Sequence, residues 1–183
     1  MKTQILGLGG TTSATSTSRR ALEHALAGAT EAGAAPALID PAELPLPLFR
    51  PDVAPNDAVA TLITAVRGAD GFLWSSPLYH GSVSAQFKNA IDWLELLSKD
   101  AEPYLHNRVV GLIMTAGGGQ ALAGIDAMQS MVRALRGWAA PRVVAVSHAT
   151  KLLDPAAPDE RTLLSLRGLG ADVAQAAARL RRP

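Results

Sequence analysis

The stretch from residue 71 to residue 98 constrains the fold more than any other part of the chain. It begins with an apolar run, GFLW, continues with SSPLYHGS, and ends with apolar residues spaced three and four apart. Pro77 fixes its own φ and lacks an N–H donor, so it is expected to stop the strand that the apolar run predicts. Ser82 and Ser84 are both candidates to cap the following helix. The pattern therefore predicts a strand, a tight exposed loop, and a helix over residues 84–98.

Strands and helices are predicted to alternate along the whole chain. The other strands are expected at residues 3–8, 35–39, 109–114 and 143–146, and the other helices around residues 21–29, 56–67, 122–138 and 159–180. Pro141 is expected to lead into the last strand. This alternation predicts a parallel α/β sheet with helices on both faces. We expect a single domain over residues 1–183, with ligands bound at the carboxyl ends of the strands.

The loop after the first predicted strand has the character of an anion-binding site. Two glycines, Gly9 and Gly10, precede a run of seven hydroxyl side chains within residues 11–18. A helix N-terminus behind such a loop offers free N–H groups and the positive end of its dipole. The Walker A pattern is absent because the loop has no lysine, and the dinucleotide fingerprint has Thr12 where its third glycine belongs. A loop for flavin mononucleotide (FMN) and a plain polar turn remain as alternatives.

A third loop of interest follows the fourth predicted strand. It contains three consecutive glycines in the sequence Thr115-Ala-Gly-Gly-Gly-Gln120. Three glycines cost chain entropy that a plain turn does not require, and they allow a flat ligand to approach the backbone closely. His148, after the fifth predicted strand, lies either at the rim of such a site or simply in solvent.

The segment SPLYHGSVSAQFKNAIDW, residues 76–93, resembles the signature of the NADPH-dependent FMN reductase family. The signature falls on Pro77, Tyr79, His80, Gly81, Ser82, Lys88, Asn89, Asp92 and Trp93, and Leu78 stands where glutamate is commonest. The resemblance covers about the first 150 residues. In the first loop the family pattern Gly-Ser-x-Arg-x-x-Ser falls on Gly10, Thr11, Ser13 and Ser16. Ser13 thus replaces the usual arginine, and Arg19 or Arg20 is a candidate replacement cation.

This resemblance implies a flavodoxin-like fold with a five-stranded parallel sheet, and an FMN-dependent NAD(P)H oxidoreductase. NADPH or NADH would deliver hydride to flavin N5, and electrons would then pass to free flavin, a quinone or a similar acceptor. Thr11, Ser16, Thr17 and Ser18 are expected at the phosphate. The expected ring contacts are Pro77, Leu78, Tyr79, His80, Gly81, Thr115, Gly117, Gly118 and Gly119. No catalytic side chain is expected, although His80 is a candidate to tune the flavin.

Two other functions stay open at this point. One is a flavodoxin-like electron carrier, although such carriers are typically strongly acidic. The other is a non-catalytic FMN-binding or interaction protein, which the departures at Ser13 and Leu78 keep open. Direct oxidation of NADPH would distinguish an enzyme from both.

Composition narrows the possible partners. Seventeen basic and sixteen acidic residues give a formal net charge of +1, which offers no electrostatic reason to expect nucleic acid. The chain has no cysteine, which excludes disulfides, thiolate nucleophiles and cysteine-based metal sites, and no metal is expected. No leader or membrane-length apolar stretch is seen, so we expect a cytoplasmic protein away from membranes.

The resemblance also suggests a homodimer or homotetramer and, as one candidate acceptor system, a flavin-dependent monooxygenase. The proline-rich stretch from residue 40 to residue 55 contains Leu44, Leu46, Leu48 and Phe49. An apolar, stiff loop needs something to cover it. A neighbouring subunit is the preferred explanation, and packing on its own sheet is the alternative.

Overall fold

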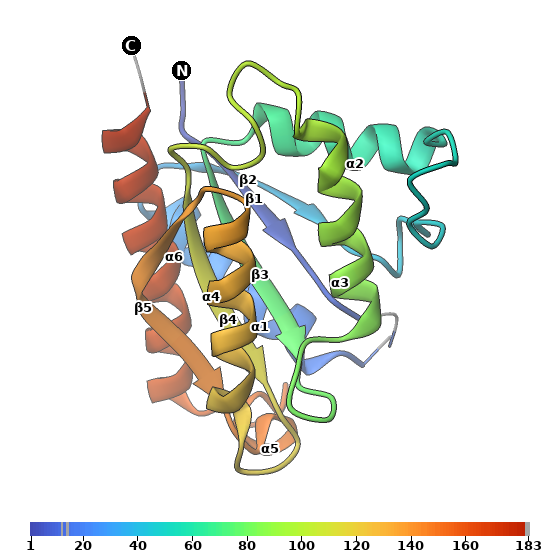
Figure 1. Cartoon of the computed structure of the whole chain (residues 1–183). Coiled ribbons are helices and arrows are strands. Elements are labelled where there is room, and N and C mark those ends of the chain that lie inside the picture. The colour runs from blue at the N-terminus through green and yellow to red at the C-terminus, as the bar shows by residue number, and fades with distance from the viewer. Residues whose placement is uncertain (12, 14, 182–183) are drawn as a thin grey trace.

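A computed structural model describes residues 1–181 except Thr12 and Ala14. Within these residues the central element is a five-stranded parallel sheet with the order β2-β1-β3-β4-β5 (Figure 1). The strands are β1 (Gln4–Leu8), β2 (Ala35–Ile39), β3 (Gly71–Pro77), β4 (Val109–Thr115) and β5 (Trp138–Val146). The predicted parallel α/β sheet is confirmed. The order reverses between β1 and β3, which is where doubly wound sheets bind ligands.

Helices cover both faces of the sheet. The helices α1 (Thr17–Glu31) and α6 (Glu160–Leu180) lie behind it in Figure 1, and α2 (Asp57–Gly68), α3 (Ala85–Asp92) and α4 (Ile125–Ala134) lie in front. Short 3-10 helices span Trp93–Leu97 and Ala121–Gly124, and the four-residue α5 (Ala149–Leu152) follows β5. Local signals explain the starts of these helices. Ser16, Asn56, Ser84 and Asp159 each cap a helix by accepting a backbone N–H at the third following residue.

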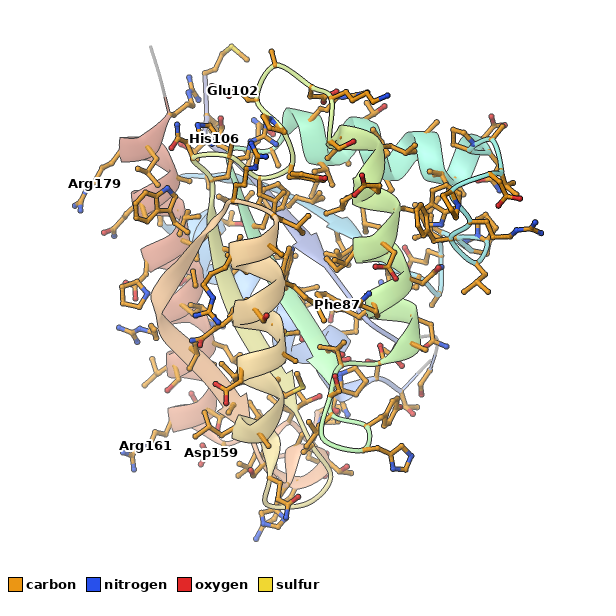
Figure 2. All side chains as sticks on the ribbon, viewed as in Figure 1. Phe87, Glu102, His106, Asp159, Arg161 and Arg179 are labelled. Carbon is orange, nitrogen blue, oxygen red and sulfur yellow. The ribbon has the colours of Figure 1, made fainter. Side chains whose placement is uncertain are left out.

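The two faces are packed differently. The front core holds the large rings of Phe72, Trp74, Phe87 and Trp93, with Phe87 between α3 and the sheet (Figure 2). The rear core consists mainly of alanine and aliphatic side chains from α1 and α6. These helices touch at Gly170, where an added Cβ would lie 1.8 Å from the Ala25 carbonyl oxygen. The alanine-rich composition thus serves close helix packing behind the sheet.

The prediction of a helix over residues 122–138 was wrong at its C-terminal end. Helix α4 ends at Ala134, Arg136 adopts a φ of +62°, and Trp138 is already the first residue of β5. Pro141 therefore lies inside the strand rather than before it. It falls where the β4–β5 register shifts between Val110 and Leu112, and β5 is an edge strand. A bulge in an edge strand tolerates the missing N–H of proline.

The proline-rich loop before α2 packs on its own chain. Leu44, Leu46 and Phe49 contact the front core, and the Phe49 ring meets Trp93 edge to face at 5.2 Å. The Asn89 amide and the Trp93 indole both donate to the Pro47 carbonyl oxygen, at 2.9 and 2.8 Å. These three side chains thus pack on the core in front of their own sheet, which agrees with the alternative explanation more closely than with a neighbouring subunit. Leu48 remains exposed.

Candidate functional site

Three loops meet at the carboxyl edge of the sheet. We call residues 9–16 the phosphate loop, residues 77–82 the tyrosine loop and residues 115–120 the glycine loop. The Ser84 hydroxyl donates to the Gly10 carbonyl oxygen, which ties the phosphate loop to the start of α3. Leu78 N donates to Thr115 O at 2.7 Å. The Thr17 hydroxyl, at the first residue of α1, lies 3.4 Å from that of Thr115. The convergence expected from the strand order is therefore present.

The hydroxyls of the phosphate loop and the first turn of α1 are organised by hydrogen bonds. Thr11 Oγ1 accepts from Ser13 N at 3.1 Å, and Ser16 Oγ accepts from Arg19 N at 3.0 Å. The hydroxyls of Ser16 and Ser18 lie 3.0 Å apart. Thr11, Ser16 and Ser18 are buried and Thr17 is half-buried, while Thr12 lies outside the described residues. The first-turn amides of α1 point out along the helix axis, which is an arrangement suited to an anion.

Arg19 is committed elsewhere and does not replace the missing arginine. Its guanidinium bonds Glu23 at 2.9 Å, Asp40 at 3.0 Å and Glu43 at 2.6 Å. Hydrogen bonds to Glu23 and Glu43 raise the pKa of Arg19 above its ordinary value. The buried Asp40 carboxylate also accepts from Ala42 N at 2.9 Å, so this cluster anchors the end of β2 to α1.

Arg20 is the other candidate cation. Its Nε is buried and has no hydrogen-bond partner within the described residues. Arg20 lies three residues after Thr17 on α1, so the two side chains share a face of the helix. Of the two candidates, only Arg20 remains available to an anion.

The tyrosine loop is a tight, exposed turn. Tyr79 and Ser82 exchange two backbone hydrogen bonds of 2.9 and 3.0 Å. His80 and Gly81, between them, have φ values of +50° and +83°, which suits glycine and strains histidine only moderately. The Tyr79 side chain is 53% exposed, so its ring is free to stack on a ligand. Ser84 rather than Ser82 is the cap of α3.

Pro77 and Leu78 lie where β3 ends beside β4. Pro77 pairs with Thr115 and is the last residue of β3, so the strand stops at this proline as expected. The Leu78 side chain packs on the front core, and its Cδ1 would lie 2.8 Å from a Cβ added at Gly124. Its N–H already bonds Thr115, so only the Leu78 carbonyl is left for a ligand.

The glycine loop leaves backbone donors free. A Cβ at Gly117 or Gly118 would meet no protein atom within 4 Å, and none of the three glycines has a positive φ. Neither packing nor backbone conformation therefore demands glycine here. The carbonyls of Ala116 and Gly118 accept from Ala149 N and His148 N, both at 2.9 Å. The N–H groups of Gly117, Gly118 and Gly119 have no acceptor in the part of the chain that the structure describes.

Sequence reasoning missed the buried serines that hold these loops in place. Ser75 Oγ donates to Ser18 O at 2.8 Å, and Ser76 Oγ accepts from Ser84 N at 2.9 Å. Both serines are fully buried at the end of β3. Two hydroxyls at the end of an otherwise apolar strand were the available signal, because buried hydroxyls need partners.

Among the described residues, no group of three or more histidine, aspartate and glutamate side chains is arranged to hold a metal ion. None of the helices formed by those residues has the length and hydropathy needed to cross a membrane.

Comparison with known proteins places this geometry in a family. A family model described as NADPH-dependent FMN reductase matches residues 3–151. An NADPH azoreductase of Bacillus sp. (strain OY1-2) is 36% identical over 94 residues, which are 50% of this chain and 48% of the relative. The NADPH-dependent FMN reductase ArsH of Shigella flexneri is 30% identical over 156 residues, 84% of this chain and 59% of the relative. The chain spans about half the length of the curated relatives it matches.

Solved structures show the same fold. The apo form of the NADH:FMN oxidoreductase EMOB superposes with a TM-score of 0.77 at 19% identity, covering 100% of this chain and 92% of that one. A flavodoxin from the domain Archaea gives 0.66 at 11% identity, covering 96% and 99%. The expected flavodoxin-like fold is confirmed.

Proposed function

The chain belongs to the NADPH-dependent FMN reductase family, and on that premise we propose that it binds FMN and uses it to pass electrons from NADPH or NADH to a small acceptor. The observation that carries this proposal is the set of groups left free at the carboxyl edge. Within the described residues the Tyr79 ring is largely exposed and the amides of Gly117, Gly118 and Gly119 have no acceptor, and the N-terminus of α1 begins at the same edge. Together they fit a flat ring carrying a phosphate tail.

Each loop has a separate task in this proposal. The amides of α1 and the hydroxyls of Thr11, Ser16, Thr17 and Ser18 would hold the phosphate. Tyr79 would stack on the ring, while the amides of Gly117, Gly118 and Gly119 would donate to its polar edge. Bound FMN supplies the N5 atom that accepts a hydride. The chain would orient the ring and leave one of its faces open to the donor and the acceptor. No side-chain base is required, because hydride transfer involves no proton abstraction by the protein.

The acceptor is proposed from chemistry that the relatives' names share. Relatives are described as azoreductases, FMN reductases and NADPH:quinone oxidoreductases. We propose a small molecule of this kind, namely a quinone, an azo compound, a metal oxyanion or free flavin passed to a flavin-dependent monooxygenase. Turnover with each at a fixed NADPH concentration would rank them.

The test is an absorbance spectrum of the protein with FMN under anaerobic conditions, before and after addition of NADPH. We expect bound flavin to bleach within seconds, and NADP⁺ added instead to leave the spectrum unchanged. Bound flavin that NADPH does not bleach would favour an electron carrier. Absence of FMN binding would contradict the proposal and point to a non-catalytic protein.

Three further properties belong to the same proposal. We propose that residues 1–183 act as one domain, that copies of it associate as a homodimer or homotetramer, and that the protein works in the cytoplasm. Light scattering after size-exclusion chromatography would measure the mass of the assembly. Cell fractionation would test the location.

A further inference from the structure

A cleft of about 480 Å³ opens beside the glycine loop, on the side of β5. Its lining residues are Gly117, His148, Thr150, Lys151 and Leu152. The strand order β3-β4-β5 places the glycine loop between the tyrosine loop and this cleft. Backbone bonds from His148 N to Gly118 O and from Ala149 N to Ala116 O hold α5 against the glycine loop. The cleft therefore shares the wall formed by Gly117 with the proposed flavin site.

The cleft is lined by a lysine whose ammonium group has no partner within the described residues. Lys151 is exposed and makes no ion pair or hydrogen bond through its ammonium group within the described residues. Among the described residues, seven other cationic side chains are paired with carboxylates: Arg19, Arg50, Arg67, Lys88, Arg142, Arg167 and Arg181.

Two carboxylates that follow α5 in the chain accept hydrogen bonds from nearby residues. Asp154 accepts from Ala156 N at 2.9 Å, and Asp159 accepts from the backbone and hydroxyl of Thr162 at 2.8 and 2.7 Å. Those bonds lower the pKa of Asp159. Arg161 adds a further positive charge at the same end of the molecule, where Figure 2 shows it beside Asp159. Within the described residues neither Asp154 nor Asp159 pairs with Lys151, so its ammonium group stays available to a ligand.

Two further polar side chains face the same space. The Thr150 hydroxyl has no hydrogen-bond partner in the described part of the chain, and it lines the cleft beside Lys151. His148 lies at the rim, with Nε2 3.9 Å from a Cβ added at Gly119. An ammonium group, a hydroxyl and an imidazole around one open cleft form a donor set for an oxyanion.

We infer that this cleft binds an anionic oxygen group, a phosphate or a sulfonate, of the second substrate that meets the flavin, with Lys151 as its cation. The inference rests on the proposed function, in which a molecule must approach the ring beside the glycine loop. Two substrates carry such groups. The nicotinamide donor has several phosphates, and some acceptors are sulfonated.

The test compares Lys151→Met with Lys99→Met. Lys99 is an exposed lysine on the segment between the 3-10 helix Trp93–Leu97 and β4, away from the glycine loop. FMN-loaded protein is titrated by calorimetry with 2′-phospho-ADP-ribose, which has the donor's phosphates but no nicotinamide, and with anthraquinone-2-sulfonate. We expect Lys151→Met to weaken binding of at least one probe about 5-fold at low salt, as an exposed charge-assisted contact would. The loss should shrink at high salt, and Lys99→Met should behave as wild type.

Which probe weakens identifies the source of the anion. A loss confined to 2′-phospho-ADP-ribose assigns the cleft to the donor, and KM for NADPH should rise with kcat unchanged. A loss confined to the sulfonate assigns it to the acceptor, and KM for a neutral quinone should not move. Equal behaviour of both variants with both probes would overturn the inference, as would a fall in kcat without any change in binding.

These readouts separate the inference from the proposed function. Calorimetry needs no turnover, so a wild-type protein that fails to oxidise NADPH still reports on the cleft. Lys151-dependent binding would then support the cleft although the reductase proposal had failed. Binding that does not depend on Lys151 would refute the cleft even in an active reductase.

Discussion

The phosphate loop and the glycine loop lie at the same edge of one sheet, but the fold depends on them in different ways. In the phosphate loop, Thr11 and Ser16 already bond backbone amides, and Gly10 is pressed against α3. In the glycine loop, three amides lack acceptors among the described residues, and open space surrounds Gly117 and Gly118. The tyrosine loop resembles the glycine loop, because Tyr79 is largely exposed. Substitutions that break these contacts in the phosphate loop should therefore cost stability, and those in the other two loops should leave stability unchanged.

The largest effect is expected from Gly10→Ala. The added Cβ would lie 2.9 Å from Phe87 Cβ and 3.1 Å from both Ser75 O and Ser84 Oγ. Overpacking of this kind costs about 2 kcal/mol, which lowers Tm by roughly 4–8 °C in a chain of this length. Thermal unfolding measures the shift. Gly118→Ala is the matched control, and it should change stability by less than about 0.5 kcal/mol. Equal losses in both variants would break the contrast between the loops.

Ser16→Asp separates the two roles of the phosphate loop. Aspartate caps a helix about as well as serine, so unfolding should change little. Its charge, however, would repel a phosphate at the start of α1, and we expect FMN affinity to fall about 30-fold, or about 2 kcal/mol. Fluorescence titration with FMN and with riboflavin, which has no phosphate, provides the control. An equal loss for the two flavins would mean that the phosphate lies elsewhere.

Tyr79→Ala tests whether the exposed tyrosine loop contributes to binding and not to stability. The ring is 53% exposed and is not part of either core, so stability should be unchanged. Loss of stacking should weaken FMN about 10-fold, which corresponds to about 1.4 kcal/mol. Tyr79→Phe keeps the ring and should retain the affinity. If the alanine variant binds FMN normally, Tyr79 is not a ring contact.

The smallest effect is expected from His80→Asn. Asparagine tolerates the left-handed backbone seen at His80, with its φ of +50°, so the turn should persist. Stability should stay within about 0.5 kcal/mol of wild type. Any change in the flavin reduction potential would then report on the imidazole itself. An unchanged potential, turnover and FMN affinity would exclude a tuning role for His80.

Local patterns were sufficient for most of the fold. The positions of β2 and of α2, α3 and α6 followed from apolar spacing and from caps that act within three residues, as at Asn56 and Asp159. The prediction of a helix through Trp138 was wrong because apolar spacing does not reveal that Arg136, just after the end of α4, adopts a left-handed backbone conformation. Likewise, Pro141 is acceptable inside β5 only because that strand lies at the sheet edge.

The sequence alone thus determined most of the strand and helix segments, and which three loops carry glycine, hydroxyl and aromatic groups. Only the tertiary structure decided how those groups are used. Arg19 is removed from the phosphate loop by Asp40 and Glu43, which follow in the chain by 21 and 24 residues. The cleft at Lys151 exists because β5 lies next to β4. Propensity and capping act over a few residues, whereas ion pairs and clefts depend on which distant strands become neighbours.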